Sequence, residues 1–276
     1  MRKIFVRILI WLGIMAVLTI VAMGLWFVMS SGSQTTASLK WLQFLQTIGT
    51  FLLPPIICAV LWDEGHKPFR WLHLDKGASW QLFVLAIGIM LCAVPGINLL
   101  ADWNSRIDLP ESLDSIEQFL KQQEETAAAL TERFLQADNI GGLLLNIGLL
   151  ALLPALAEEL SFRGTLQQVL TKSQIHTAVW FTAILFSAIH MQFYGFIPRM
   201  LMGAMFGYVF VWSGSLWVPI VMHFTNNSMA VLAYYLVSDK DIADTIGAGD
   251  TWWLGVISLM LTSLGLLIFY RRTHTR

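Results

Sequence analysis

Three short polar motifs in the second half of the chain contain residues that could activate a water molecule. The first is the pair Glu158 and Glu159, followed four residues after Glu159 by Arg163. At about 100° per residue, Glu159 and Arg163 lie roughly 40° apart on one helical face, so they can form an ion pair. Glu158 lies roughly 140° from Arg163 and stays available for chemistry. The spacing predicts a structural role for Glu159 and a chemical role for Glu158. The alternative is a helix end that reaches lipid headgroups.

The second and third motifs add two histidines and an asparagine. His190 follows Phe186 at a spacing of four residues, and Asn227 follows His223 at the same spacing. Each pair therefore shares one face of a helix. Taken singly, His190 could be a packing residue, and His223 with Asn227 could form hydrogen bonds between helices. Together the motifs place a carboxylate, two imidazoles and an amide on three apolar helices. Four such residues are poorly explained by separate packing roles, so we interpret them as one site.

These side chains have the chemistry needed to hydrolyse a peptide bond. A carboxylate in a dry pocket is suited to general-base catalysis near neutral pH, so Glu158 could activate water with His190 beside it. His223 and Asn227 could donate hydrogen bonds to the tetrahedral oxygen. Alternatively, Glu158, His190 and His223 could bind zinc and leave one position open for water. The sequence contains neither the HExxH of common zinc peptidases nor the GxSxG of serine hydrolases.

The composition indicates that the helices carrying these motifs lie in lipid. Of the 276 residues, 56% are hydrophobic and 13% are charged, and the mean hydropathy is +0.65. A soluble domain has about 25% charged residues. The net charge of −1 and the lack of a basic cluster or base-stacking motif exclude nucleic acid as an expected partner. Cys58 and Cys92 lie in apolar runs without paired spacing, so both are expected to be buried packing residues.

A membrane-spanning helix needs about 20 mostly apolar residues. About eight segments satisfy this, near residues 4–29, 41–62, 80–101, 139–160, 177–193, 196–213, 216–237 and 252–270. The expected fold class is therefore all-α, a polytopic membrane bundle of about eight transmembrane helices. The first segment follows basic residues like a signal peptide, but its apolar stretch is longer, so we expect an uncleaved span. The fifth and sixth segments are joined only by Tyr194 and Gly195, which predicts a hairpin that turns within the membrane.

Basic residues in the short loops predict the orientation of the bundle. These basic residues fall on one side of the bundle, which is therefore expected to be cytoplasmic and to hold both termini. They are Arg2, Lys3, Lys67, Arg70, Lys76, Lys172, Arg271 and Arg272. The acidic stretches 102–138 and 238–250 fall on the outer side. Within 102–138, apolar residues recur at helical spacing among Glu and Gln, which predicts an amphipathic helix lying on the membrane or on the bundle. A substrate-binding lid is the alternative.

In this order, the three motifs resemble the signature of the CAAX prenyl endopeptidase type II family, also called the CPBP family of intramembrane proteases. The resemblance covers roughly residues 140–236. It implies an active-site cavity inside the membrane, reached from the cytoplasmic side. Family members are described both as metalloproteases and as glutamate proteases without a metal, so zinc and a metal-free mechanism are equally plausible. Ser161 stands where members often carry a bulky aromatic residue, which puts the shape of the cavity in question.

The resemblance also implies roles for the individual residues. It implies that Glu158 activates water with help from His190, and that Glu159 and Arg163 support the site. It assigns His223 and Asn227 to oxyanion stabilisation or to metal binding.

The sequence therefore divides into three expected parts: N-terminal membrane helices with an amphipathic outer loop (1–138), a CPBP-like catalytic core (139–237), and an outer loop with a final membrane helix (238–276). The expected function is an intramembrane endopeptidase of a bacterial cytoplasmic membrane, acting on a peptide or membrane-protein substrate in the lipid bilayer. The alternatives are a non-enzymatic immunity or scaffold protein of the same family, and a transporter, for which the expected inverted repeats are lacking.

Overall fold

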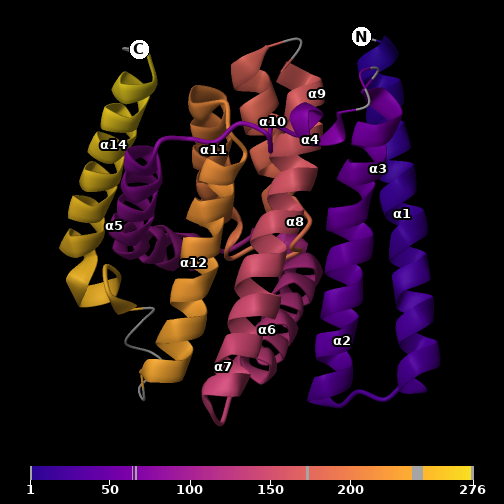
Figure 1. The fold of residues 1–276 in the computed structure, drawn as a ribbon. Helices are drawn as coiled ribbons and strands as arrows, with labels where there is room; N and C mark the ends of the chain where they lie inside the picture. The colour runs from indigo at the N-terminus through magenta and orange to yellow at the C-terminus, as the bar shows by residue number, and fades with distance from the viewer. Residues whose placement is uncertain (1, 64, 66, 172–173, 238–244, 275–276) are drawn as a thin grey trace.

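The computed structural model describes residues 2–63, 65, 67–171, 174–237 and 245–274. Within these ranges it contains helices and no strand, so the predicted all-α fold class is confirmed. Most of the long helices run side by side along one direction, and the two chain termini lie at the same end of the bundle (Figure 1). Lys172 and residues 238–244 of the predicted outer loop lie outside the described residues.

Among the residues that the structure describes, six helical segments are long and apolar enough to cross a membrane. They are Arg2–Ser30, Thr36–Trp62, Trp80–Ser105, Ile140–Thr171, Phe196–Ser213 and Gly249–His274. The predicted number of about eight depends on two further helices. The apolar helix α10 (Ile175–Ala188) has 14 residues, and α12 (Trp217–Leu236) has 20 residues that include the polar third motif. A polytopic membrane bundle is therefore established, and the count of eight is not.

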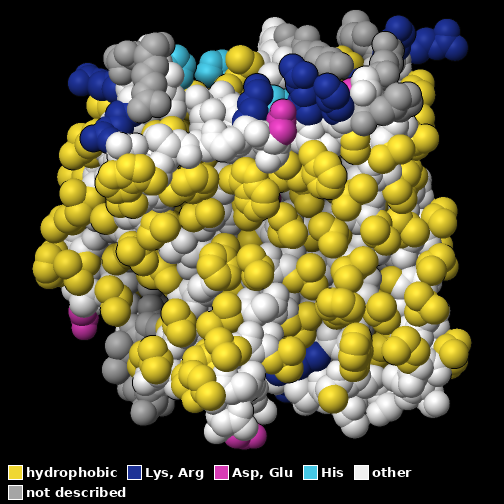
Figure 2. Space-filling model, in the orientation of Figure 1, with side chains coloured by type: hydrophobic (Ala, Val, Ile, Leu, Met, Phe, Trp, Pro, Cys, Tyr) yellow, Lys and Arg dark blue, Asp and Glu magenta, His cyan; other side chains and the backbone are white. Residues whose placement is uncertain are grey.

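The surface of the bundle fits a lipid environment. Figure 2 shows hydrophobic side chains over the middle of the visible face and most Lys and Arg side chains at the end that holds the termini. Large apolar side chains such as Ile20 and Val28 are 70% and 78% exposed. Large patches of exposed apolar side chains are rare on soluble monomers, but lipid tails solvate such patches. Cys58 is buried as predicted, whereas Cys92 is exposed on this apolar surface, so the prediction that it is buried is wrong.

The first and last helices pack at opposite edges of the bundle (Figure 1). Helix α1 (Arg2–Ser30) packs on the segment formed by α2 (Thr36–Gln46), η1 (Thr47–Leu52) and α3 (Leu53–Trp62). The short helix α4 (Pro68–Trp71) leads into α5 (Trp80–Ser105), which packs along α14 (Trp252–His274), itself preceded by η5 (Gly249–Thr251). Glycine permits this close packing, because a Cβ on Gly96 would lie 2.8 Å from Leu259.

The central helix of the bundle contains wide turns on both sides of the first motif. It consists of α7 (Ile140–Asn146), η3 (Ile147–Leu152), α8 (Leu153–Ser161), η4 (Phe162–Gln167) and α9 (Gln168–Thr171). The π-helical turn η3 precedes Pro154, just as η1 precedes Pro54. Proline has no N–H and its ring crowds the carbonyl four residues earlier, so the helix widens there. Helix α8, which carries both glutamates, is thus flanked by π turns, a feature frequent at functional sites.

The hairpin between α10 and α11 (Phe196–Ser213) is shorter than predicted on its first arm. Helix α10 ends at Ala188, so His190 lies in the following turn, and the expectation of a helix over 177–193 is wrong there. The chain reverses at Met191, which has a positive φ of 54°. Asn104, at the end of α5, holds this turn by donating to the Phe193 carbonyl at 3.1 Å and accepting from the Ile197 N–H at 2.8 Å.

The predicted amphipathic helix exists as α6 (Asp114–Leu135), which follows η2 (Glu111–Leu113). Phe134 is buried against the bundle, whereas Ile116 and Phe119 are half exposed. Helix α6 contacts α2 and α12, and the Glu124 carboxylate accepts a hydrogen bond from the Tyr194 N–H at 3.3 Å. It therefore lies on the bundle, against the turn that carries His190.

Candidate active site

The two glutamates of α8 have different environments. Glu159 and Arg163 have no exposed side-chain surface, and Arg163 Nη1 lies 2.7 Å from Glu159 Oε1. The predicted ion pair is therefore confirmed. The side chain of Glu158 keeps 14% of its surface exposed. Among the described residues, Glu158 has no ionic contact shorter than its 3.9 Å approach to His223.

Two aromatic rings and a backbone carbonyl fix the Arg163 guanidinium. Its Cζ lies 4.7 Å from the centre of the Phe186 ring and 5.4 Å from that of Phe206. Its Nη2 donates to the Gly203 carbonyl at 2.9 Å. Cation–π contacts of this kind are stronger when they are desolvated, as here. Phe206 was not singled out from the sequence, because one aromatic residue in an apolar helix carries no distinctive signal.

Two glycines on α11 allow close contacts with its neighbours: Gly207 with the central helix and with α10, and Gly203 with α10. Gln167, one turn after Arg163, donates to the Gly207 carbonyl at 3.0 Å. A Cβ on Gly207 would lie 2.7 Å from Gln167 Oε1, and a Cβ on Gly203 would lie 3.2 Å from the Phe186 ring. The spacing of Gly203 and Gly207 is the small-residue pattern that brings membrane helices into close contact.

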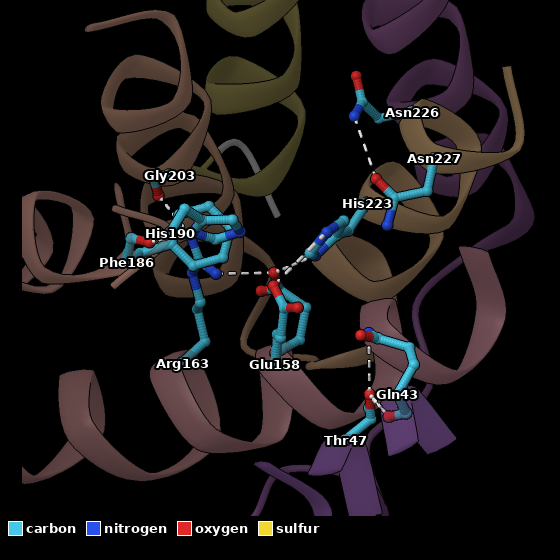
Figure 3. Close-up of polar contacts among 11 residues, drawn as sticks. Gln43, Thr47, Glu158, Arg163, Phe186, His190, Gly203, His223, Asn226 and Asn227 are labelled. Carbon is cyan, nitrogen blue, oxygen red and sulfur yellow. Dashed lines mark hydrogen bonds and ion pairs between the residues drawn. The ribbon is translucent and has the colours of Figure 1, made fainter. Parts of the chain in front are cut away.

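His223 lies between the two glutamates. Its Nδ1 is 2.9 Å from Glu159 Oε1, and its Nε2 is 3.9 Å from Glu158 Oε2. Figure 3 shows the His223 ring pointing from α12 toward the carboxylates of α8. The ring stacks on Phe206, with centroids 5.4 Å apart and an interplanar angle of 25°. Because Nδ1–H donates to Glu159, Nε2 is the atom directed toward Glu158.

His190 is held by its own motif. Its Nδ1 lies 2.8 Å from the Phe186 carbonyl oxygen, and the two rings meet edge to face at 5.3 Å. A carbonyl can only accept, so Nδ1 carries the proton and Nε2 is free to accept a hydrogen bond. Phe186 also meets the His223 ring at 5.9 Å. The aromatic residue of the second motif therefore positions both histidines and Arg163.

Asn227 is on α12, one turn after His223, but the structure does not join it to the carboxylates. Its Oδ1 accepts a hydrogen bond from Asn226 Nδ2 at 3.2 Å, as Figure 3 shows. No hydrogen bond between Asn227 and either glutamate occurs in the part of the chain that the structure describes. Since its oxygen is occupied by Asn226, the amide nitrogen of Asn227 is the end available to donate.

The predicted zinc ligands are not arranged as a metal site. Within the described ranges, no group of three or more His, Cys, Asp or Glu side chains is placed to hold a metal ion. Glu158 and His223 approach each other, and His190 presents its Nε2 from a separate turn. These donors are chemically suitable for zinc but do not converge on one point, so they do not fit a three-ligand zinc site as they stand.

Arg199 is a further charged residue near the site, and the sequence analysis missed it. It lies in the first turn of α11, inside a candidate membrane span. Its Nη2 donates to Gln192 Oε1 at 2.8 Å, and it interacts electrostatically with Glu158. The available signal was the presence of a cation within the apolar segment 196–213, which is costly in lipid and marks a functional position by default.

Comparison with known proteins finds similarity over the part of the chain that carries the three motifs. Residues 140–229 match the family model described as Type II CAAX prenyl endopeptidase Rce1-like. This part of the chain therefore resembles that family of membrane proteases, and the resemblance expected from the three motifs is confirmed. The chain is also similar to the protein YpbD of Bacillus subtilis (strain 168), with 34% identity over 79 residues. That match covers 27% of this chain and 38% of YpbD. No solved structure matches the chain.

Proposed function

We propose that this protein is an intramembrane endopeptidase that hydrolyses a peptide bond in a peptide or membrane-protein substrate. One observation carries the proposal: two adjacent carboxylates of α8 lie in different environments. Glu159 is fully buried and paired with Arg163, whereas Glu158 keeps 14% of its side chain exposed beside His223. A nearly buried carboxylate that keeps a small exposed surface can still contact a water molecule, which makes it a suitable general base.

In the proposed reaction, Glu158 takes a proton from a water molecule that then attacks the scissile carbonyl carbon. His190 assists, because its Nε2 is free to accept the second hydrogen bond of that water. The proton on Glu158 is then transferred to the departing amine as the tetrahedral intermediate collapses. The water supplies the hydroxyl group of the new carboxylate, and its proton completes the new amine.

His223 and Asn227 supply the hydrogen bonds that stabilise the oxyanion. The bond from His223 Nδ1 to Glu159 fixes the ring, and an Nε2–H on the same ring donates to the negative oxygen. Arg163 holds the Glu159 carboxylate in position. Asn227 donates through its free amide nitrogen. Each of these steps uses the chain's own groups, and none passes through a metal ion.

The proposal includes the placement of the protein. The segment 139–237 is the catalytic core, with 1–138 and 238–276 completing the bundle around it. The Lys and Arg side chains at the end that holds both termini favour a cytoplasmic location for that end. The location that we propose is a bacterial cytoplasmic membrane.

The proposal is tested by replacing Glu158 in the full-length protein reconstituted in liposomes. A mixed peptide library is incubated with each variant, and the products are identified by mass spectrometry. We expect Glu158→Gln to lower the cleavage rate at least about 100-fold, the contribution typical of a general base. Glu125→Gln, at an exposed glutamate of α6, is the matched control and should keep the full rate.

Full activity of the Glu158→Gln variant would refute the peptidase mechanism. Survival of the protein's cellular role after combined replacement of Glu158, His190 and His223 would favour a non-enzymatic immunity or scaffold function. Substrate flux across liposomes without any peptide cleavage would indicate a transporter.

A further inference from the structure

Arg199 has a hydrogen-bond donor that is buried and unused. Its Nη2 donates to Gln192, but its Nη1 is buried without a hydrogen-bond partner. Buried donors nearly always have a partner, so an unpaired one needs an explanation. Within the described residues, no acidic side chain lies within ion-pair distance of Arg199. The guanidinium is therefore held by a neutral amide, and it has a free N–H and no direct ion-pair partner among the described residues.

The turn between α10 and α11 is shaped around this guanidinium. A Cβ on Gly195 would lie 2.9 Å from Arg199 Nη2 and 3.7 Å from Nη1. Any larger residue at position 195 would therefore displace the charged group. Gln192, in the same turn, fixes its other edge. The chain thus provides both the space and an orienting contact for a cation within an apolar segment.

The guanidinium is also close to the proposed reaction centre. Arg199 interacts electrostatically with Glu158 and with His190, the groups assigned to water activation. It interacts in the same way with Glu124 of α6, which accepts a hydrogen bond from the Tyr194 N–H. A substrate that reaches Glu158 therefore enters the electric field of Arg199.

We propose that Arg199 binds a carboxylate of the substrate beside Glu158 and selects peptides that carry this negative charge close to the scissile bond. A neutral carbonyl would satisfy the free N–H but would leave the guanidinium without a direct ion-pair partner in a low dielectric. A carboxylate accepts a hydrogen bond from the free N–H and also pairs with the positive charge, because guanidinium matches it in charge and in geometry. The carboxylate can belong to the C-terminus of the substrate or to an acidic side chain. This inference rests on the proposed peptidase function and adds a specificity-determining residue to it.

The test measures binding, so that it does not depend on cleavage. The probe is an acetylated apolar tripeptide in two forms, one with a free C-terminal carboxylate and one with a C-terminal amide. A third probe has the C-terminal amide and one aspartate side chain, which separates the two sources of carboxylate. Dissociation constants are measured by titration calorimetry on the full-length protein in detergent.

We expect the wild-type protein to bind at least one carboxylate probe about tenfold or more tightly than the amide, as for a charge-assisted hydrogen bond. Arg199→Gln should abolish this preference, and Arg199→Lys should keep part of it, which separates loss of the contact from misfolding. Arg106→Gln, which removes an exposed arginine paired with Asp102, should keep the full preference. Circular dichroism checks that each variant is folded.

Equal affinity of the wild-type protein for all three probes, or absence of binding, would overturn the proposal. So would a carboxylate preference that survives in Arg199→Gln. The competing role for Arg199 is to anchor α6 through Glu124, and it predicts that Glu124→Gln removes the preference as well. Failure to cleave any peptide, with the carboxylate preference intact, would count against the peptidase function and not against this site.

Discussion

Replacement of Arg163 by methionine tests whether the buried ion pair holds the site together. Arg163 and Glu159 are both fully buried, 2.7 Å apart, in the interior of a membrane bundle. Methionine has a similar length and can fill the space between Phe186 and Phe206. The substitution therefore removes the charge with little change in volume, and it leaves the Glu159 carboxylate with His223 as its remaining partner.

The expected cost follows from the charge that is left unpaired. Removing one partner of a buried ion pair costs about 3–5 kcal/mol, because the other charge stays desolvated. The cation–π contacts do not add their full value, since the methionine sulfur also interacts favourably with aromatic rings. Total stabilities are about 5–15 kcal/mol. We therefore expect Arg163→Met to lose roughly a fifth or more of the free energy of unfolding.

The measurement is equilibrium unfolding of the purified variants in mixed detergent micelles, followed by circular dichroism. Glu159→Gln combined with Arg163→Met is the decisive variant, because it leaves no isolated charge. It should regain about 2 kcal/mol or more relative to Arg163→Met alone, since neutral replacements of buried pairs are often tolerated. Arg106→Met, at an exposed pair with Asp102, is the control and should cost at most about 1 kcal/mol.

Two results would refute this reasoning. One is a loss below about 1 kcal/mol in Arg163→Met, the value expected of a surface pair. The other is a double variant that is as unstable as the single variant. Either would mean that the hydrogen bond from Arg163 to Gly203 or the aromatic contacts carry the stability, and that the pairing with Glu159 does not.

Three further predictions concern the oxyanion, the helix contact and the metal. Asn227→Ala should lower kcat about 100- to 1000-fold with little change in KM, as for loss of an oxyanion donor, and unchanged kcat would remove Asn227 from the mechanism. Gly207→Val should lower the unfolding midpoint, because its Cβ would lie 2.7 Å from Gln167 Oε1, whereas Gly148→Ala, where a Cβ meets nothing within 4 Å, should be tolerated. A chelator should change the cleavage rate less than twofold, since Glu158, His190 and His223 do not converge, and a metal-dependent rate with zinc in the purified protein would contradict this.

Helical spacing was sufficient to predict the ion pair of the first motif. The angle between Glu159 and Arg163 identified them as partners, and the contact at 2.7 Å agrees, although the helix widens into the π turn η4 between them. The same spacing could not predict that His223 would lie between the two glutamates, because that contact joins helices far apart in the sequence. It was also misleading for His190, since α10 ends before that residue and the histidine is placed by a turn.

The missed contribution of Arg199 has a physical explanation. A single arginine near the start of an apolar segment has the same appearance as a basic residue that reaches the membrane surface, and only the path of the chain distinguishes the two. Because α10 is short and the chain turns early, the first turn of α11 brings Arg199 into electrostatic interaction with Glu158. The turn at Met191, held by Asn104, thus places this arginine near the proposed reaction centre. Weakening that turn should therefore disturb the carboxylate preference before it disturbs the Glu159–Arg163 pair, which belongs to a different helix.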